Sequence, residues 1–238
     1  MTPESAEIGA RLAAVRQRIE AVDRSHTHVV EITAVTKTFP PATVAAAVEA
    51  GCSAIGENYA SDLLTKRDLL DSLDAAVRPR VDFIGQLQSN KVRQLVGVVD
   101  RWCTVDRVSL VRELAKRTAG AEVLIQVDTT GEPGKGGCAE AQVPALLERC
   151  SESGLSVLGL LTVGPTIGGP EAAAPGFDRV RRLADELGLD VCSMGMTGDL
   201  EVAVAAGATN VRVGSAIFGP RPAAADHTHV HPDGGGRG

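Results

Sequence analysis

The chain has 238 residues, a net charge of −6 and 44% hydrophobic residues, a composition typical of a globular protein that buries a sizeable core. The acidic balance gives no overall attraction to phosphate backbones, so we expect no nucleic-acid partner. No window approaches the roughly 20 apolar residues that span a bilayer, so we expect no membrane segment. The five cysteines are scattered, with no C-x-x-C pair, which indicates reduced thiols and a cytoplasmic protein.

Short apolar segments alternate with helical patterns along most of the chain. The first 20 residues, MTPESAEIGARLAAVRQRIE, predict an amphipathic helix rather than a signal peptide. Segments of 3.6-residue periodicity follow each apolar run, and several of them end in Gly, as helix C-termini often do. The apolar runs predict eight strands, at 29–35, 52–56, 81–85, 99–105, 122–128, 156–161, 190–194 and 209–214.

Eight strands, each followed by a helix, predict a single (β/α)₈ TIM barrel with an extra N-terminal helix. A doubly wound open sheet is the alternative, but the glycine-rich first turn typical of that fold is missing. We expect residues 1–221 to form this barrel domain and residues 222–238 to be a disordered tail. The histidines in HTHVH, within that tail, are interpreted as incidental. All five histidines lie near the chain ends, which argues against a Ser-His-Asp triad or a multi-histidine metal site in the body.

The first predicted strand ends in a lysine, Lys37, shortly before Pro40 and Pro41. Active sites of these barrels lie at the C-terminal ends of the strands. Burial there would lower the pKa of an amine and make it reactive. The alternative is that Lys37 is a solvated strand end whose amine extends into water.

Other strand ends carry groups that could hold a ligand. Asn58 follows the second strand and offers an amide, although it could simply cap a helix. The loops after strands seven and eight often hold a phosphate in such barrels, through backbone N–H groups and a helix dipole. Arg212 interrupts an apolar strand, so an inward guanidinium would need a ligand or a carboxylate. The residues predicted to form the phosphate cup are Thr197, Gly198, Gly214 and Ser215.

A reactive lysine, a phosphate cup and an arginine between them suit pyridoxal 5′-phosphate. Lys37 would hold the aldehyde as a Schiff base, and the cup would hold the phosphate. A cofactor-free aldolase that uses Lys37 on a phosphorylated sugar is a weaker alternative.

Five segments, in order, resemble the YggS/PROSC family of pyridoxal-phosphate-binding homeostasis proteins. The similarity runs from about Ala6 to Arg221. It implies a barrel like the N-terminal domain of alanine racemase (PLP fold type III), Lys37 as the Schiff-base lysine, and an arginine, Arg212, that faces the pyridine nitrogen. It also implies that Asn58 lies near the ring and that Thr197, Gly214 and Ser215 hold the phosphate. The segments are AVTKTFP, IGENYASDLLTK, FIGQLQSNK, SMGMTGDLEVAVAAG and VRVGSAIFGPR.

A few positions depart from the pattern of that family. Thr36 and Thr197 stand where serine is common, and both keep a hydroxyl. Val81 and Asp82 replace a frequent Trp-His pair, and the EPGKGG loop differs in detail. These departures concern peripheral contacts rather than the lysine.

Cofactor binding alone does not make the protein an enzyme. Racemisation needs a second base opposite Lys37, for which Cys103 and Tyr59 are the candidates. An arginine at the pyridine nitrogen disfavours its protonation and weakens the ring as an electron sink. The resemblance implies a carrier that maintains the supply of the cofactor, affects amino- and keto-acid balance and delivers to pyridoxal-phosphate-dependent apoenzymes. A racemase-like enzyme of fold type III is the alternative. The 3% aromatic content predicts a monomer.

Overall fold

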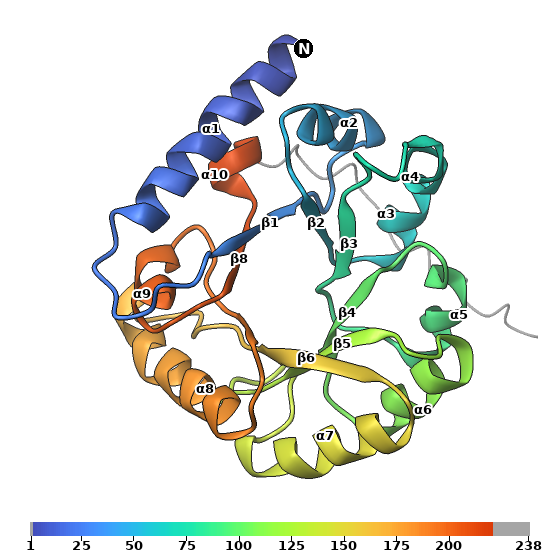
Figure 1. The fold of residues 1–238 in the computed structure, drawn as a ribbon, viewed down its shortest axis with the longest axis vertical. Helices are drawn as coiled ribbons and strands as arrows, with labels where there is room; N and C mark the ends of the chain where they lie inside the picture. Colours follow the sequence, from blue (N-terminus) through green and yellow to red (C-terminus); the bar gives the residue numbers. More distant parts are fainter. Residues whose placement is uncertain (1, 221–238) are drawn as a thin grey trace, which may run out of the picture.

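The computed structural model describes residues 2–220, and in this range eight parallel strands close into a barrel in chain order (Figure 1). The predicted (β/α)₈ barrel, with a helix ahead of the first strand, is confirmed. The tail predicted at 222–238 lies outside the described residues. The strands are β1 (Glu31–Val35), β2 (Ala54–Glu57), β3 (Arg80–Phe83), β4 (Arg101–Val105), β5 (Glu122–Gln126), β6 (Ser156–Leu161), β7 (Val191–Ser193) and β8 (Asn210–Val213).

Helices surround the barrel and return the chain from the end of one strand to the start of the next (Figure 1). Several helices are short, and 3₁₀ turns precede α5, α7 and α8. None of the described helices is long and apolar enough to cross a bilayer. The α-helices are α1 (Pro3–Glu20), α2 (Pro41–Glu49), α3 (Ala60–Thr65), α4 (Arg67–Ser72), α5 (Val92–Leu95), α6 (Val108–Arg117), α7 (Val143–Glu152), α8 (Ala174–Glu186), α9 (Leu200–Ala205) and α10 (Ser215–Phe218), and the 3₁₀ turns are η1 (Ser89–Lys91), η2 (Glu140–Gln142) and η3 (Pro170–Ala173).

The extra helix α1 packs outside the barrel against α2, α9 and α10. Its start follows from the sequence, because the Thr2 side chain accepts a hydrogen bond from the backbone N–H of Ser5 and Pro3 occupies the first turn. Its buried residues recur every three or four positions, so one stripe of the helix faces the barrel. These residues are Ser5, Ile8, Leu12, Val15 and Ile19.

The two faces of each strand meet different environments. On β1, Ala34 joins the hydrophobic core between sheet and helices, whereas Thr33 faces the barrel interior and donates a hydrogen bond to Asp82 of β3. A separate small apolar cluster, Cys103, Leu124 and Leu161, fills part of the interior. Ile84, Leu158, Val163 and Val191 pack against this cluster, and polar side chains such as Thr33, Asp82 and Arg212 are buried elsewhere in the barrel. This alternation follows from the two-residue period of a strand.

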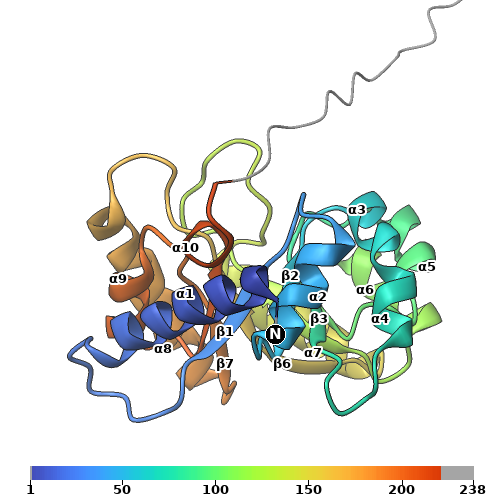
Figure 2. The ribbon, with the colours of Figure 1, turned by 90° about the horizontal axis from the view of Figure 1, so that it is seen from above.

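All strands end on the same side of the barrel because they are parallel. The loops after β5 and β6 rise together on that side (Figure 2). Two contacts join them: Glu132 accepts hydrogen bonds from the backbone N–H and the hydroxyl of Thr166, and Lys135 donates to the carbonyl of Gly164 at 2.6 Å. The mouth of the barrel is therefore framed by two linked loops.

Candidate functional site

Lys37 lies in a turn just past the end of β1 and is half-buried. The next residue, Thr38, has a φ of 67°, a left-handed conformation that costs a threonine roughly 1–2 kcal/mol. Strand β8 pairs with β1, and Ala34 stands opposite Val213 in the register. A Cβ placed on Gly214 would lie 3.5 Å from the Cβ of Val35. Barrel closure thus brings the Lys37 turn next to the residues that follow β8.

The predicted phosphate cup is assembled from the loops after β7 and β8. The hydroxyl of Ser215 lies 3.3 Å from the hydroxyl of Thr197, and Gly214 is the N-terminal cap residue of α10. A Cβ on Gly198 would meet no atom within 4 Å, so the cup is open at this position. The first N–H groups of any helix lack intrahelical partners, and together with two hydroxyls they suit an anion.

Helix α1 reaches the same cup. Arg18 donates a hydrogen bond to the backbone carbonyl of Thr197 at 3.1 Å and pairs with Glu201 at 2.7 Å. The extra helix therefore braces the loop that carries the Thr197 hydroxyl.

Arg212 points into the barrel interior and is buried. Its guanidinium donates to the hydroxyl of Ser193 at 2.9 Å and to the backbone carbonyl of Thr162 at 2.8 Å. Burial lowers the pKa of Arg212 to about 10, which still leaves it cationic at neutral pH. The sequence led us to expect a ligand or a carboxylate as the partner of an inward Arg212. In the structure, the Ser193 hydroxyl and the Thr162 carbonyl accept its hydrogen bonds.

A chain of hydrogen bonds connects Arg212 to the opposite end of the barrel. Ser193 donates to the side-chain carbonyl of Asn210 at 2.6 Å, and Asn210 donates to the hydroxyl of Thr33 at 2.9 Å. Thr33 donates to Asp82 at 2.9 Å, and Arg101 pairs with the same carboxylate at 2.8 Å. Each of these hydrogen bonds joins a donor to an acceptor, so none of the buried groups in the chain lacks a partner. The chain therefore fixes the position of Arg212 from the N-terminal end of the strands.

The carboxylate at the base of this chain stays ionised. Burial by itself would raise the pKa of Asp82, but the hydrogen bond from Arg80 and the charge of Arg101 lower it below its usual value. The negative charge of Asp82 in the barrel interior is therefore balanced by the positive charges of Arg80 and Arg101.

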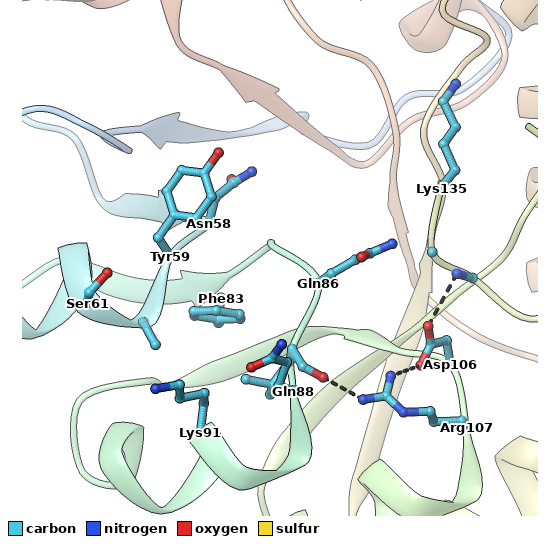
Figure 3. Close-up of a pocket in the computed structure, with 14 residues that line it drawn as sticks. Asn58, Tyr59, Ser61, Phe83, Gln86, Gln88, Lys91, Asp106, Arg107 and Lys135 are labelled. Atoms are coloured by element: carbon cyan, nitrogen blue, oxygen red, sulfur yellow. Dashed lines mark hydrogen bonds and ion pairs between the residues drawn. The ribbon is translucent and has the colours of Figure 1, made fainter. Parts of the chain in front are cut away.

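Asn58 lines a cavity of about 660 Å³ between the ends of β2 and β5 (Figure 3). Its side-chain oxygen is buried and has no hydrogen-bond partner among the described residues. Asn58 and Tyr59 lie on one side of this cavity and Lys135 on the other, with Gln86 between them. Of the seven residues predicted for the site, Asn58 alone lines this cavity, so the cavity includes neither the cup nor the Lys37 turn.

Close backbone packing places Asn58. A Cβ on Gly85 would lie 2.0 Å from the backbone oxygen of Asn58, so only glycine fits at the end of β3. The alternative that Asn58 caps a helix is wrong, since the cap residue of α3 is Tyr59.

The lysine that is fully buried is not Lys37 but Lys66. Its ammonium lies 2.6 Å from Glu57, 2.9 Å from the carbonyl of Thr36 and 3.2 Å from Asp62. Burial raises the pKa of Glu57 to about 7 against the opposing charge of Lys66. Sequence reasoning missed this group, although Asp62 and Lys66 form an (i, i+4) pair that could have indicated it.

The two candidates for a second base differ in accessibility. Cys103 is buried in the barrel interior, and burial raises the pKa of its thiol well above the usual value. Tyr59 is 53% exposed at the rim of the cavity. A thiol in this environment is a poor base.

Comparison with known proteins adds independent information. Residues 10–222 match the family described as alanine racemase, N-terminal domain. The chain is 38% identical to the pyridoxal phosphate homeostasis protein of Pseudomonas aeruginosa, over 91% of this chain and 95% of that protein. It is 36% identical to the pyridoxal phosphate homeostasis protein of Aquifex aeolicus, over 89% of this chain and 97% of that protein.

The chain belongs to the pyridoxal phosphate homeostasis protein family. A solved relative is also similar: PipY of Synechococcus elongatus with pyridoxal phosphate bound has 29% sequence identity and a TM-score of 0.75, with 89% of this chain and 100% of PipY covered. The family predicted from the five sequence segments is therefore confirmed, together with the alanine-racemase-like barrel.

Proposed function

We propose that this protein binds pyridoxal 5′-phosphate, holds it as a Schiff base on Lys37 and serves in the homeostasis and delivery of this cofactor. The observation that carries the proposal is the placement of the Lys37 turn beside the cup. Val35 and Gly214 are in contact distance of each other, and the Thr197 and Ser215 hydroxyls meet 3.3 Å apart. Homologous proteins are named for pyridoxal phosphate homeostasis, and the PipY structure has the cofactor bound.

The residues present fit the cofactor. The cofactor, when bound, supplies an aldehyde and an electron-accepting ring. Thr197, Gly214 and Ser215 would hold its phosphate through hydroxyl and backbone donors. Lys37, in the turn after β1, would supply the amine that holds the aldehyde as a Schiff base. Asn58, with an unpaired buried oxygen at the cavity wall, would lie near the ring.

Arg212 would face the pyridine nitrogen. Because Arg212 stays cationic and is fixed by Ser193 and the Thr162 carbonyl, it disfavours a second positive charge on that nitrogen. This favours storage over catalysis. Burial also raises the pKa of the Cys103 thiol, which makes it a poor second base and argues against a racemase-like activity.

Finer parts of the proposal concern the cellular role. We place the protein in the cytoplasm, a reducing compartment, since its five cysteines are all free and buried. We propose that it acts as a monomer, that pyridoxal-phosphate-dependent apoenzymes receive the cofactor from it and that amino- and keto-acid balance depends on that supply.

The test is the visible absorption spectrum of the purified protein mixed with pyridoxal 5′-phosphate, followed by borohydride reduction and mass mapping. We expect a yellow protein whose reduced adduct lies on Lys37. After unbound cofactor, which is itself yellow, has been removed, the Lys37→Ala variant should be colourless, whereas a control at an exposed helix lysine, Lys116→Ala, should match the wild type. A wild-type protein that stays unmodified would refute the Schiff base, and an adduct on another lysine would refute the assignment of Lys37.

A further inference from the structure

The turn that carries Lys37 is held on both sides by one group of charged residues, Glu57, Asp62 and Lys66, which we call the anchor cluster. On one side, Thr36 donates its hydroxyl to Glu57 at 2.5 Å and its carbonyl accepts from Lys66 at 2.9 Å. On the other side, the backbone N–H of Thr38 donates to Asp62 at 2.6 Å. Both neighbours of Lys37 are therefore tied to the same cluster.

The cluster is internally connected and mostly shielded from water. Lys66 bridges Glu57 at 2.6 Å and Asp62 at 3.2 Å, and the side chains of Lys66 and Glu57 are 0% exposed, against 20% for Asp62. The buried hydrogen bonds of Lys66 and Glu57 are stronger than they would be in water, whereas the bond from Thr38 to Asp62 lies at the exposed edge of the cluster. Glu57 ends β2, Asp62 lies in α3 and Lys66 is the residue between α3 and α4, so the chain that follows β2 holds the Lys37 turn.

The held turn is strained. Thr38 is the one non-glycine residue between positions 2 and 220 with a positive φ. A threonine leaves this conformation unless the surrounding structure holds it there. The short hydrogen bond from its N–H to Asp62, together with the two bonds at Thr36, supplies that hold.

We propose that Asp62 and Lys66 are positioning residues for Lys37: they keep its turn in the strained conformation that directs the amine to the cofactor site. The inference rests on the proposed function, since it requires that Lys37 forms a Schiff base. Neither residue touches the cofactor. We therefore expect them to affect the formation of the Schiff base and not the non-covalent binding of the cofactor, whose phosphate the cup holds.

The experiment compares two ligands of the full-length apoprotein. Pyridoxal 5′-phosphate reports Schiff-base formation by visible absorbance, whereas pyridoxamine 5′-phosphate has an amine in place of the aldehyde and reports non-covalent binding alone. The test variant is Asp62→Ala, which removes the acceptor at Thr38 and leaves Lys66 bonded to Glu57 and Thr36. The control is Asp68→Ala, an exposed aspartate in the first turn of α4.

In Asp62→Ala we expect Schiff-base formation about tenfold slower, the effect of losing one hydrogen bond to a carboxylate. The affinity for pyridoxamine 5′-phosphate should stay within about twofold of the wild type, and Asp68→Ala should match the wild type for both ligands. Adding Thr38→Gly to Asp62→Ala should recover most of the rate, because glycine adopts a positive φ without strain. A merely structural role for Asp62 would not produce this rescue.

The outcomes separate this inference from the proposed function. A wild-type protein that forms no Schiff base on Lys37 overturns the proposed function itself. A wild-type protein that forms it, with Asp62→Ala equally fast, overturns the inference alone. The inference is also overturned if Asp62→Ala weakens Schiff-base formation and pyridoxamine 5′-phosphate binding equally, and adding Thr38→Gly restores neither.

Discussion

The buried pair of Lys66 and Glu57 allows a prediction about stability that can be worked out in detail. The substitution is Lys66→Met, which keeps a long side chain and removes the ammonium. In the wild type this ammonium is the closest cation to Glu57, at 2.6 Å, and both side chains are 0% exposed. After the substitution, Glu57 keeps only the Thr36 hydroxyl as a hydrogen-bond donor among its described partners.

The magnitude follows from the titration of Glu57. Burial raises its pKa to about 7, above the usual value for a glutamate. Its contribution to stability is therefore present below the unfolded pKa and is lost as pH rises through about 7. Without Lys66 the folded pKa rises further, so the loss continues above pH 7 at about 1.4 kcal/mol per pH unit.

Two pH values give distinct expectations for Lys66→Met. At about pH 6, below the raised pKa of Glu57, the carboxyl is mostly protonated in both proteins, and the variant loses chiefly hydrogen bonds, about 1–3 kcal/mol. At about pH 8.5 the unpaired carboxyl adds about 2 kcal/mol, which brings the total into the range of about 3–5 kcal/mol known for broken buried pairs. The double variant Lys66→Met/Glu57→Gln carries no buried charge at this pair and should be more stable than Lys66→Met at high pH.

The assay is urea denaturation of the wild type, both single variants and the double variant at the two pH values. The double-mutant cycle gives the coupling between Lys66 and Glu57 directly. The reasoning is refuted if the destabilisation by Lys66→Met is the same at both pH values. It is also refuted if the double variant is no more stable than Lys66→Met at the higher pH.

Three further predictions concern other parts of the site. Gly85→Ala places a Cβ 2.0 Å from the backbone oxygen of Asn58 and should destabilise the protein by about 1–3 kcal/mol or more in urea denaturation, with weaker binding of pyridoxal 5′-phosphate. Ser193→Ala removes an acceptor of the buried Arg212 and should cost about 1–3 kcal/mol, and an unchanged urea midpoint would contradict the network. The lowered pKa of Asp82 means that its stabilisation is present above its unfolded pKa and is lost as pH falls through the folded value. The urea midpoint of the wild type should therefore fall in acid more steeply than that of Asp82→Asn.

Much of the fold could be predicted from the sequence. Each of the eight predicted strands exists, with ends that differ by a few residues; the segment predicted at 99–105 becomes β4, Arg101–Val105. Continuous runs of apolar and β-branched residues indicate strands because both faces of a parallel strand are buried, as in β2, β4 and β8. Glycines follow several of the helices between them. Boundaries were less accurate because neighbouring strands decide where pairing stops.

The candidate site was predicted in part. The positions of Thr197, Gly214 and Ser215 at two successive strand ends indicated a cup, and their loops do meet. The (i, i+4) spacing of Asp62 and Lys66 indicated a pair, but it did not indicate that Lys66 rather than Lys37 would be the fully buried lysine. The exposure of a lysine depends on which helix packs over it, and that is a property of the assembled barrel.

The sequence by itself determined the local structure and the chemical groups: strands of period two, helices with recognisable ends, and the lysine, hydroxyls and arginine at strand ends. Tertiary structure alone decided which of these groups meet. Closure of the barrel places β1 beside β8, from opposite ends of the chain, and so puts the Lys37 turn next to Gly214. It also connects Arg212 through Ser193 to the opposite end of the barrel. Hydrogen bonds and ion pairs act over a few ångströms, so their partners are set by proximity in space rather than by position in the chain.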